Sequence, residues 1–472
     1  MFVFTLFFCL ISLSIGCKYT LQENTLTVSD CDTCKDSFSS INTPSSLKII
    51  FENTVKSFQS NEFNDIKIIS LTIPQSLTSF DFGDIDTSEL KEITLDPLNN
   101  YYYIENNMVI EKESHTAVLY MNGIDTDEYH FHYSILKVKK RLFYRNQFIK
   151  RLYLNKYLER LDDKCFSEMS SLEEVYIDDR IIELGKSLFA KSISLKTIYY
   201  FKLKEPLQSE GLFNGIGEVT IKVMNTFDKN SFCNKTISKS LLYNQRCGEY
   251  VHCIIEQVEN GNNMFLIKGT GKTYDYDVSL FDKTEIQIRS ITIDKYITSI
   301  GRNMLVDLKE IELIGIHPEN SDLQIINGVV YGKGGTELIL YPHYIEELYF
   351  FLPLTVTYIY PKAFHMNKKL RHVFIQNDNV VIADTQIVDI EQVDFFIHYG
   401  NEYKLFGFGS HTTIHSIIDC SGEICYHIIS ENEKQTLFIF GKGVLESNNY
   451  IDEYNYDDII ISNDVNNNKI SK

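Results

Sequence analysis

The chain has 472 residues and a formal net charge of -19, from 45 basic and 64 acidic side chains, and its pI is near 5.1. Nucleic acid and anionic membranes are therefore unfavourable partners, because they carry charge of the same sign. The length is sufficient for large apolar cores.

The first 16 residues form an uncharged and mostly apolar stretch. The small residues Ser14 and Gly16 stand just before Cys17. This pattern predicts a secretory signal peptide that is cleaved after Gly16, and a membrane-spanning helix would need roughly 20 apolar residues. No second long apolar run follows, and residues 458–472 lack the hydrophobic tail of a lipid-anchor signal. We expect a secreted chain, or one held at the cell surface by another molecule.

Three segments begin with a cysteine and continue into two stretches of alternating apolar and polar residues. This alternation predicts a β-hairpin, which we call a head. The heads cover residues 17–30, 247–271 and 420–443, and they divide the chain into residues 17–246, 247–419 and 420–472. Only a short tail rich in Asn and Asp follows the third head, which either caps the preceding repeats or marks a gene that ends early.

The first two modules each contain a second, longer hairpin, at residues 96–120 and 317–341. Asn106-Asn107 and Asn327-Gly328 are turn pairs suited to positive φ, and apolar strand residues flank them. The presence of the same variant in both modules supports the division of the chain.

Residues 149–200 repeat themselves. Ile149, Leu172 and Leu195 are 23 apart, and they open the phrases IKRLYL, LEEVYI and LKTIYY. Each phrase alternates with period two and predicts a short strand, and the piece after it, which ends at Phe166 or Phe189, looks like one or two turns of helix. So small a unit cannot bury its apolar face alone. Successive units must therefore stack into a solenoid with one continuous core.

The same frame recurs elsewhere in the chain. Segments 70–80, 290–305 and 350–375 resemble the BspA-like leucine-rich repeats of bacterial and protist surface proteins. The family phrase is matched in pieces at Ile73-Pro74, Ile300-Gly301, Leu352-Pro353 and Ala363-Phe364. The resemblance implies a leucine-rich repeat solenoid of ~23-residue units, mainly short β-strands with short helical turns, and cysteine-led hairpin heads. It also implies an adhesive role.

The ten cysteines suggest disulfides in a secreted chain. Cys9 leaves with the signal peptide, and Cys165 occupies an inward position of the repeat, which predicts a buried free thiol. Eight disulfide candidates remain, with pairing expected within the heads (Cys247 with Cys253, Cys420 with Cys425): Cys17, Cys31, Cys34, Cys233, Cys247, Cys253, Cys420 and Cys425. No metal is expected, because the C-x-x-C of Cys31 and Cys34 has no second pair at zinc spacing.

Two further short motifs occur in the chain. Asn234-Lys235-Thr236 is an N-glycosylation sequon, which we expect on a surface loop. Residues 269–273 resemble the end of a phosphate-binding loop, but Leu266 stands where that loop needs glycine. We therefore interpret them as a hairpin turn and expect no cofactor.

A row of tyrosines is the candidate binding site. Tyr153, Tyr176 and Tyr199 take the same outward position in three consecutive repeats, so stacking places their rings about 5 Å apart, beside Arg151 and Glu174. Such a row either stabilises the sheet through cross-strand aromatic pairs or forms an exposed binding stripe. Both interpretations stay open at this point.

The sequence favours a non-enzymatic recognition protein. The chain has no serine nucleophile elbow, Cys/His pair or zincin helix. We expect the solenoid to bind an extracellular protein or glycan of a host, matrix or neighbouring cell. The alternatives are a structural or decoy coat protein without a specific ligand and, with less support, a secreted hydrolase.

Overall fold

The protein was analysed as a computed structural model. It describes residues 17–34, 45–59, 67–81, 86–178, 180–207, 210–258, 261–277, 280–281, 286–360, 362–364, 367–377, 379–382, 393–398, 413–417, 419–421, 424–431, 434–441, 443–444, 456–462 and 465–466. The expected signal peptide lies outside these residues.

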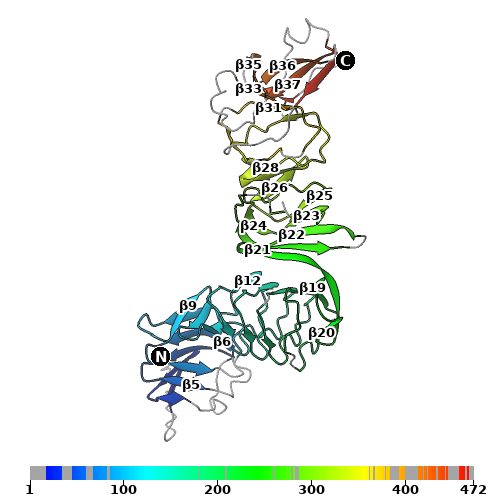
Figure 1. The fold of residues 1–472 in the computed structure, drawn as a ribbon. Helices are drawn as coiled ribbons and strands as arrows, with labels where there is room; N and C mark the ends of the chain where they lie inside the picture. Colours follow the sequence, from blue (N-terminus) through cyan, green and yellow to red (C-terminus); the bar gives the residue numbers. More distant parts are fainter. Residues whose placement is uncertain are drawn as a thin grey trace, which may run out of the picture. The chain divides into compact units, whose positions relative to one another are not determined.

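The chain divides into two compact units, Met1–Leu241 and Leu242–Lys472. The division falls inside the long strand β21 (Lys235–Gln257), which is labelled in Figure 1. The first two residues of β21 pair antiparallel with the preceding strand, and the next ones pair in parallel with another strand of unit 1; its last residues pair antiparallel with the next strand of unit 2. The module boundaries at residues 246 and 419 stay a prediction from the repeats.

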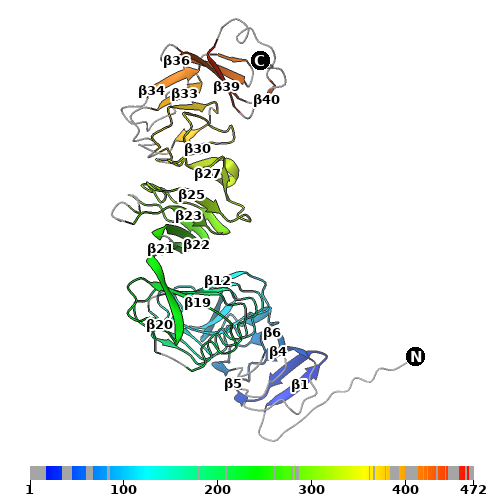
Figure 2. The same cartoon turned by 90° about the vertical axis from the view of Figure 1, so that its right-hand side faces the viewer.

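Unit 1 is a coil of short strands. Its strands are β1 (Lys18–Gln22), β2 (Thr25–Ser29), β3 (Thr33–Cys34), β4 (Ser46–Phe51), β5 (Ser57–Gln59), β6 (Lys67–Ile73), β7 (Ser79–Asp81), β8 (Glu92–Leu95), β9 (Tyr102–Glu105), β10 (Met108–Glu111), β11 (Thr116–Tyr120), β12 (Glu128–His130), β13 (Lys137–Val138), β14 (Arg151–Tyr153), β15 (Arg160–Leu161), β16 (Glu174–Ile177), β17 (Glu183–Leu184), β18 (Thr197–Tyr200), β19 (Thr220–Met224) and β20 (Ser231–Phe232). Figure 2 shows the successive turns between β12 and β19.

Each turn of the coil adds one strand to each of two parallel sheets. One sheet runs in the order β12-β14-β16-β18-β19, and the other contains β13, β15 and β17. Arg151 lies opposite Glu174, and Glu174 lies opposite Thr197, so neighbouring turns are offset by the 23 residues of the sequence repeat. The inward residues Leu152, Val175 and Ile198 are fully buried in a shared core. The solenoid prediction is confirmed.

The segments between the strands are turns rather than helices, which corrects the expected short helical pieces. Lys164 and Glu168 have φ of 56°, in the left-handed region that ends a helix. The backbone N–H groups of Lys164, Phe166 and Glu168 donate to carbonyls of the next turn, at 2.9, 3.1 and 2.8 Å. These donors are thus used between turns. Among the described residues the helical element is the short 3-10 turn η2 (Lys333–Gly335).

The variant hairpin divides the core of unit 1. Strands β9, β10 and β11 form an antiparallel sheet with both faces covered. Val109 and Leu119 pack into the core of the first turns, whereas Met108 and Ile110 pack into the core of the later turns. The hairpin therefore joins two apolar clusters, which explains why its strand residues are nearly all apolar.

Unit 2 repeats this plan. It continues with β22 (Asn263–Thr273), β23 (Ser290–Ile293), β24 (Tyr296–Ser299), β25 (Leu313–Ile316), β26 (Leu323–Ile326), β27 (Val329–Gly332), β28 (Glu337–Leu340), β29 (Tyr349–Phe351), β30 (Tyr358–Ile359), β31 (His372–Ile375), β32 (Val381–Ile382), β33 (Asp394–His398), β34 (Thr413–Ile417), β35 (Asp419–Ser421), β36 (Ile424–Glu431), β37 (Lys434–Gly441), β38 (Gly443–Val444), β39 (Asp458–Ile461) and β40 (Val465–Asn466). Strands β26 to β28 form the second variant hairpin.

The three heads begin in the same way. Strands β1 and β2, the end of β21 with β22, and β36 with β37 are antiparallel hairpins. A parallel strand then adds to the second strand of each: β4 to β2, β23 to β22 and β39 to β37. The third head is thus followed by a parallel strand, as the other two are.

Buried or half-buried asparagines tie several turns to the ones before them. The Nδ2 of Asn99 donates to the carbonyls of Pro74 and Leu77, at 2.7 and 3.1 Å, while its Oδ1 accepts from the N–H groups of Tyr101 and Tyr102. This arrangement satisfies polar groups inside the coil. Hydrogen bonds from Nδ2 to carbonyls of the preceding turn are also made by Asn155, Asn320, Asn367 and Asn377.

Candidate recognition face

The outward face of β12, β14, β16, β18 and β19 carries two rows of side chains, because alternate strand residues point to opposite sides. The aromatic row consists of His130, Tyr153, Tyr176, Tyr199 and Lys222. The row beside it begins with the charged residues Glu128, Arg151 and Glu174 and ends with Thr197 and Thr220; we call it the charged row. Together these rows contain all five predicted binding residues.

The rings of the aromatic row are stacked face to face. Ring centroids are 4.2 Å apart between His130 and Tyr153, 4.3 Å between Tyr153 and Tyr176, and 4.5 Å between Tyr176 and Tyr199. The Nζ of Lys222 lies 5.2 Å from the Tyr199 centroid, a cation–π contact at the end of the row. The stacked row that the repeat predicts is therefore present.

The row is not an exposed stripe. Tyr153 and Tyr176 are 0% exposed, and Tyr199 is 4% exposed. Each ring face contacts the next ring, so little aromatic surface is left for a ligand. Of the two interpretations drawn from the sequence, this geometry favours cross-strand packing.

Burial also perturbs the hydroxyl of Tyr176. It raises the pKa of Tyr176 well above its usual value of 10, with added repulsion from Tyr153 and Glu174. The hydroxyl donates to Oε2 of Glu174 at 2.5 Å. Tyr176 is therefore a neutral donor, and Glu174 serves as its acceptor.

The charged row is internally paired. Nη2 of Arg151 lies 2.5 Å from Oε1 of Glu128, and Nε2 of His130 lies 3.4 Å from Oε2 of the same carboxylate. The Arg151 side chain is 17% exposed and that of Glu128 is 4% exposed. Arg151 and Glu174 thus hold neighbouring side chains in place on this face.

Unit 2 has an aromatic row at the equivalent strand position. Phe351, Phe374 and Phe396 are stacked, with centroid distances of 5.0 and 4.8 Å. Phe438 and Phe440 of β37 lie over them, each 4.9 Å from Phe374. The hairpin of the third head therefore covers the outward face of the preceding sheet, with apolar rings on both sides of the contact.

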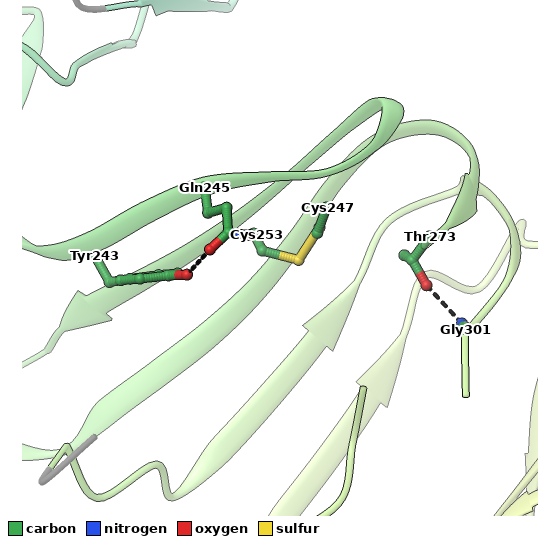
Figure 3. The surroundings of a disulfide bond; sticks show 6 residues. All are labelled: Tyr243, Gln245, Cys247, Cys253, Thr273 and Gly301. Atoms are coloured by element: carbon green, nitrogen blue, oxygen red, sulfur yellow. Dashed lines mark hydrogen bonds between the residues drawn. A yellow bond between two sulfur atoms is a disulfide. The ribbon is translucent and has the colours of Figure 1, made fainter. Parts of the chain in front are cut away.

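The cysteines of the heads form disulfides. Cys247 bonds Cys253, as expected for pairing within heads, and Cys17 bonds Cys31, which directly follows the first head. Figure 3 shows the second bond beside Thr273, whose hydroxyl accepts from the N–H of Gly301 at 2.6 Å. A Cβ at Gly301 would lie 1.9 Å from the Tyr274 carbonyl oxygen, so the repeat glycine allows this close approach.

The other candidate cysteines differ among themselves. Cys425 is disulfide-bonded, and Cys420 is its strand partner in the β35–β36 pairing, although the side chain of Cys420 lies outside the described residues. The side chain of Cys34 lies outside them too. Cys165 is a buried free thiol that donates to the carbonyl of Asp162 at 2.7 Å, and burial raises its pKa.

Cys233 is a free thiol, so its place among the disulfide candidates is wrong. It lies in the last turns of unit 1, far along the coil from Cys34, and Cys17 and Cys31 bond each other. Burial, followed by the nearby Glu205 carboxylate, raises the pKa of its thiol to about 12. This raised pKa leaves little thiolate at neutral pH.

The sequon lies on a tight turn. Cys233 and Asn234 have φ of 46° and 62° and join β20 to β21 as a two-residue hairpin loop. Asn234 and Thr236 are exposed. The loop borders an open hollow of about 450 Å³ whose lining includes Glu210, Phe213 and Lys235. Accessibility of this kind is a requirement for glycosylation, which stays a prediction.

The described part of the chain offers neither a membrane-spanning helix nor a cluster of metal ligands. None of its helices is long and apolar enough to span a membrane. Within the same residues, no three His, Cys, Asp or Glu side chains converge in a way that could hold a metal ion.

A coil of 23-residue turns with short parallel strands and disulfide-bonded heads is a leucine-rich repeat architecture. Residues 34–137 and 120–216 match the family described as "BspA type Leucine rich repeat region", in six copies. Residues 34–216 are therefore built of BspA-type leucine-rich repeats.

The likeness of this chain to whole proteins is more distant. No curated protein matches the chain. A solved leucine-rich repeat protein from Eubacterium ventriosum is 15% identical, with a TM-score of 0.32, over 67% of this chain and 98% of that one. The pneumococcal vaccine antigen PcpA is 13% identical, with a TM-score of 0.23, over 48% and 91%. A leucine-rich cell surface protein from Faecalibacterium prausnitzii is 11% identical, with a TM-score of 0.23, over 85% and 98%. TM-scores this low carry no conclusion about function.

Proposed function

We propose that this chain is a non-enzymatic recognition protein, secreted or displayed at a cell surface, whose solenoid binds an extracellular protein or glycan. The observation that carries the proposal is the regular presentation of side chains. Parallel turns hold equivalent residues in rows about 4.8 Å apart, and such rows offer many weak contacts along an extended surface. The family match supports this role.

The extracellular location rests on two features. The uncharged apolar start of the chain has the composition of a secretory leader, and disulfides persist in oxidising compartments. A glycan on the exposed Asn234 would agree with the same location.

The stacked tyrosines act in this proposal as packing groups. Tyr153, Tyr176 and Tyr199 hold the strands in register, and ligand contacts come from side chains that are exposed. The alternative is a structural coat protein without a specific ligand. The buried tyrosine row is compatible with that alternative too, because packing alone accounts for the row.

The proposal is tested by binding of the purified chain, residues 17–472 with its disulfides formed, to cells and to glycan and protein arrays. We expect saturable binding that is lost when the disulfides are reduced and the chain unfolds. Absence of saturable binding to every cell and array, with native circular dichroism, would favour the coat protein.

A further inference from the structure

Positive charge is concentrated in one short stretch of this acidic chain. Residues 137–164 contain ten Lys or Arg and three Asp or Glu, a net charge of 10 − 3 = +7. The whole chain carries -19, so the other residues carry -19 − 7 = -26. Such a local reversal of sign indicates an electrostatic binding surface rather than a general solubility effect.

The second parallel sheet of unit 1 and its turns bring six of these ten bases together, whereas Lys150, Arg151 and Lys156 lie at or beside β14 of the first sheet. Val138, Leu161 and Leu184 point into the core, so their strand neighbours Lys137 and Arg160 point outward. The turns that follow also stack, because the N–H of Arg141 donates to Asp163 and that of Lys164 donates to Lys186. We call the resulting surface the basic face; its residues are Lys137, Lys139, Lys140, Arg141, Arg160, Lys164 and Lys186.

Some of these bases are already neutralised. Lys140 pairs with Asp81 at 3.0 Å. Arg160 pairs with Asp162 at 3.1 Å and with Glu183 at 3.5 Å. Lys140 and Arg160 are thereby neutralised, so binding of an anion falls to the lysines of the basic face that make no such pair.

Four lysines of the basic face are available to a ligand. Lys137, Lys139, Lys164 and Lys186 are exposed, and none makes an ion pair with another described residue. Other lysines of unit 1 differ: Lys150 lies 3.2 Å from Asp127 and Lys196 lies 3.0 Å from Glu173, whereas Lys48, Lys91 and Lys204 are exposed without an ion pair to another described residue. The basic face thus offers four exposed cations that make no ion pair with another described residue.

Aromatic contacts orient the arginine of this surface. The guanidinium groups of Arg141 and Arg145 lie 4.8 and 5.0 Å from the Tyr144 centroid. Arg145 is also held by Asp86 and Glu168, each at 3.0 Å. Tyr144 is thereby fixed between the two cations, and Arg141 is held beside the lysines with φ of 61°.

We propose that the basic face binds an acidic polysaccharide, one that carries sulfate or carboxylate groups. This inference rests on the proposed recognition function and names its ligand class. Three stacked turns span roughly 10 Å, which is the length of two or three sugar units. The basic face thus matches a short anionic segment of a flexible chain.

The charge distribution favours a polysaccharide over a membrane or a nucleic acid. Screening limits the attraction of these lysines to about 8 Å at physiological salt. A flexible polysaccharide can approach within that distance locally, whereas a flat anionic membrane or a stiff duplex would also face the acidic remainder of the chain.

The test is a titration of the full mature chain with a heparin-derived hexasaccharide, with neutral dextran as the blank. The triple variant Lys139→Gln, Lys164→Gln, Lys186→Gln should bind roughly tenfold more weakly, because three charge contacts of modest strength are lost. The matched variant Lys150→Gln, Lys196→Gln, Lys204→Gln removes the same charge elsewhere in unit 1 and should change binding less than about twofold. Wild-type binding should also weaken as salt is raised.

Several outcomes would overturn the inference. These are equal weakening by the two triple variants, no hexasaccharide binding by the wild type, or equally tight binding of a single-stranded DNA 12-mer or of phosphatidylserine vesicles. The cell-binding assay separates this failure from failure of the recognition function. If the Lys139, Lys164 and Lys186 variant still binds cells as the wild type does, the polysaccharide site is wrong and recognition stands.

Discussion

The outward aromatic rows of the two units occupy the same position in the repeat but differ in chemistry. Unit 1 uses Tyr153 and Tyr176, with charged residues beside them. Unit 2 uses Phe374 and Phe396, covered by further phenylalanines. One backbone position can therefore be packed with hydroxyl-bearing rings and polar partners or with hydrocarbon alone. The difference shows that an outward position in this coil is not by itself a binding position.

The largest effect is expected from removing a ring. Tyr176→Ala should lower the free energy of unfolding by about 3–5 kcal/mol, because a fully buried ring with stacked neighbours is replaced by a cavity. Phe374→Ala should act similarly in unit 2. Urea unfolding followed by circular dichroism measures both.

Tyr133→Ala provides the control, because that ring is 57% exposed and its loss should cost less than about 0.5 kcal/mol. Wild-type stability of Tyr176→Ala together with lost ligand binding would show that the row is a binding stripe after all.

A smaller effect is expected from exchanging the chemistry of the two rows. Tyr176→Phe should cost about 1–2 kcal/mol, because Glu174 loses a buried donor. Phe374→Tyr should cost about 1–3 kcal/mol, because it places a hydroxyl against Phe438 and Phe440. The same unfolding measurement applies, and a gain of stability in either variant would contradict the assignment of the rows as polar and apolar.

The smallest expected effect is the pH dependence of stability that Glu168 contributes in the turns of unit 1. Partial burial alone would raise the pKa of Glu168, but hydrogen bonds from Arg145 and Lys191 outweigh it and hold the pKa below the usual 4.5. The unfolded chain therefore takes up the proton first as pH falls. The stabilisation is present above about pH 4.5 and is lost as pH falls through the lower, folded pKa.

Glu168→Gln tests this contribution. The variant should be less stable than the wild type by under 1 kcal/mol at pH 7, because solvent screens a partly exposed pair. The difference should vanish in acid. Urea midpoints at pH 7 and pH 3 measure it, and an equal difference at both values would exclude the carboxylate as the titrating group.

Local sequence was sufficient for the register of the coil. The 23-residue spacing of Ile149, Leu172 and Leu195 predicts which strands pair and which residues face inward, because both follow from periodicity. Pairing of Cys247 with Cys253 was predictable for another reason, since the two lie six residues apart within one head.

Features that depend on distant residues were not predictable. The cover over Phe374 comes from Phe438, 64 residues later, and no local pattern announces that contact. The turns at Lys164 and Glu168 looked helical because apolar spacing does not reveal that their N–H groups bond the next turn. The basic face was missed because its residues belong to three separate turns and the overall charge is acidic.

The asparagine bonds between turns restrict how such a chain can change in length. The side-chain Nδ2 of Asn99, for example, donates to carbonyls 22 and 25 residues earlier, while its Oδ1 accepts from N–H groups of its own turn. Loss or gain of a few residues in between would shift those carbonyls away from the amide, whereas loss or gain of one complete turn restores every partner. Duplication and deletion are thus tolerated in whole repeats, which lets the length of the solenoid vary while its cross-section stays fixed.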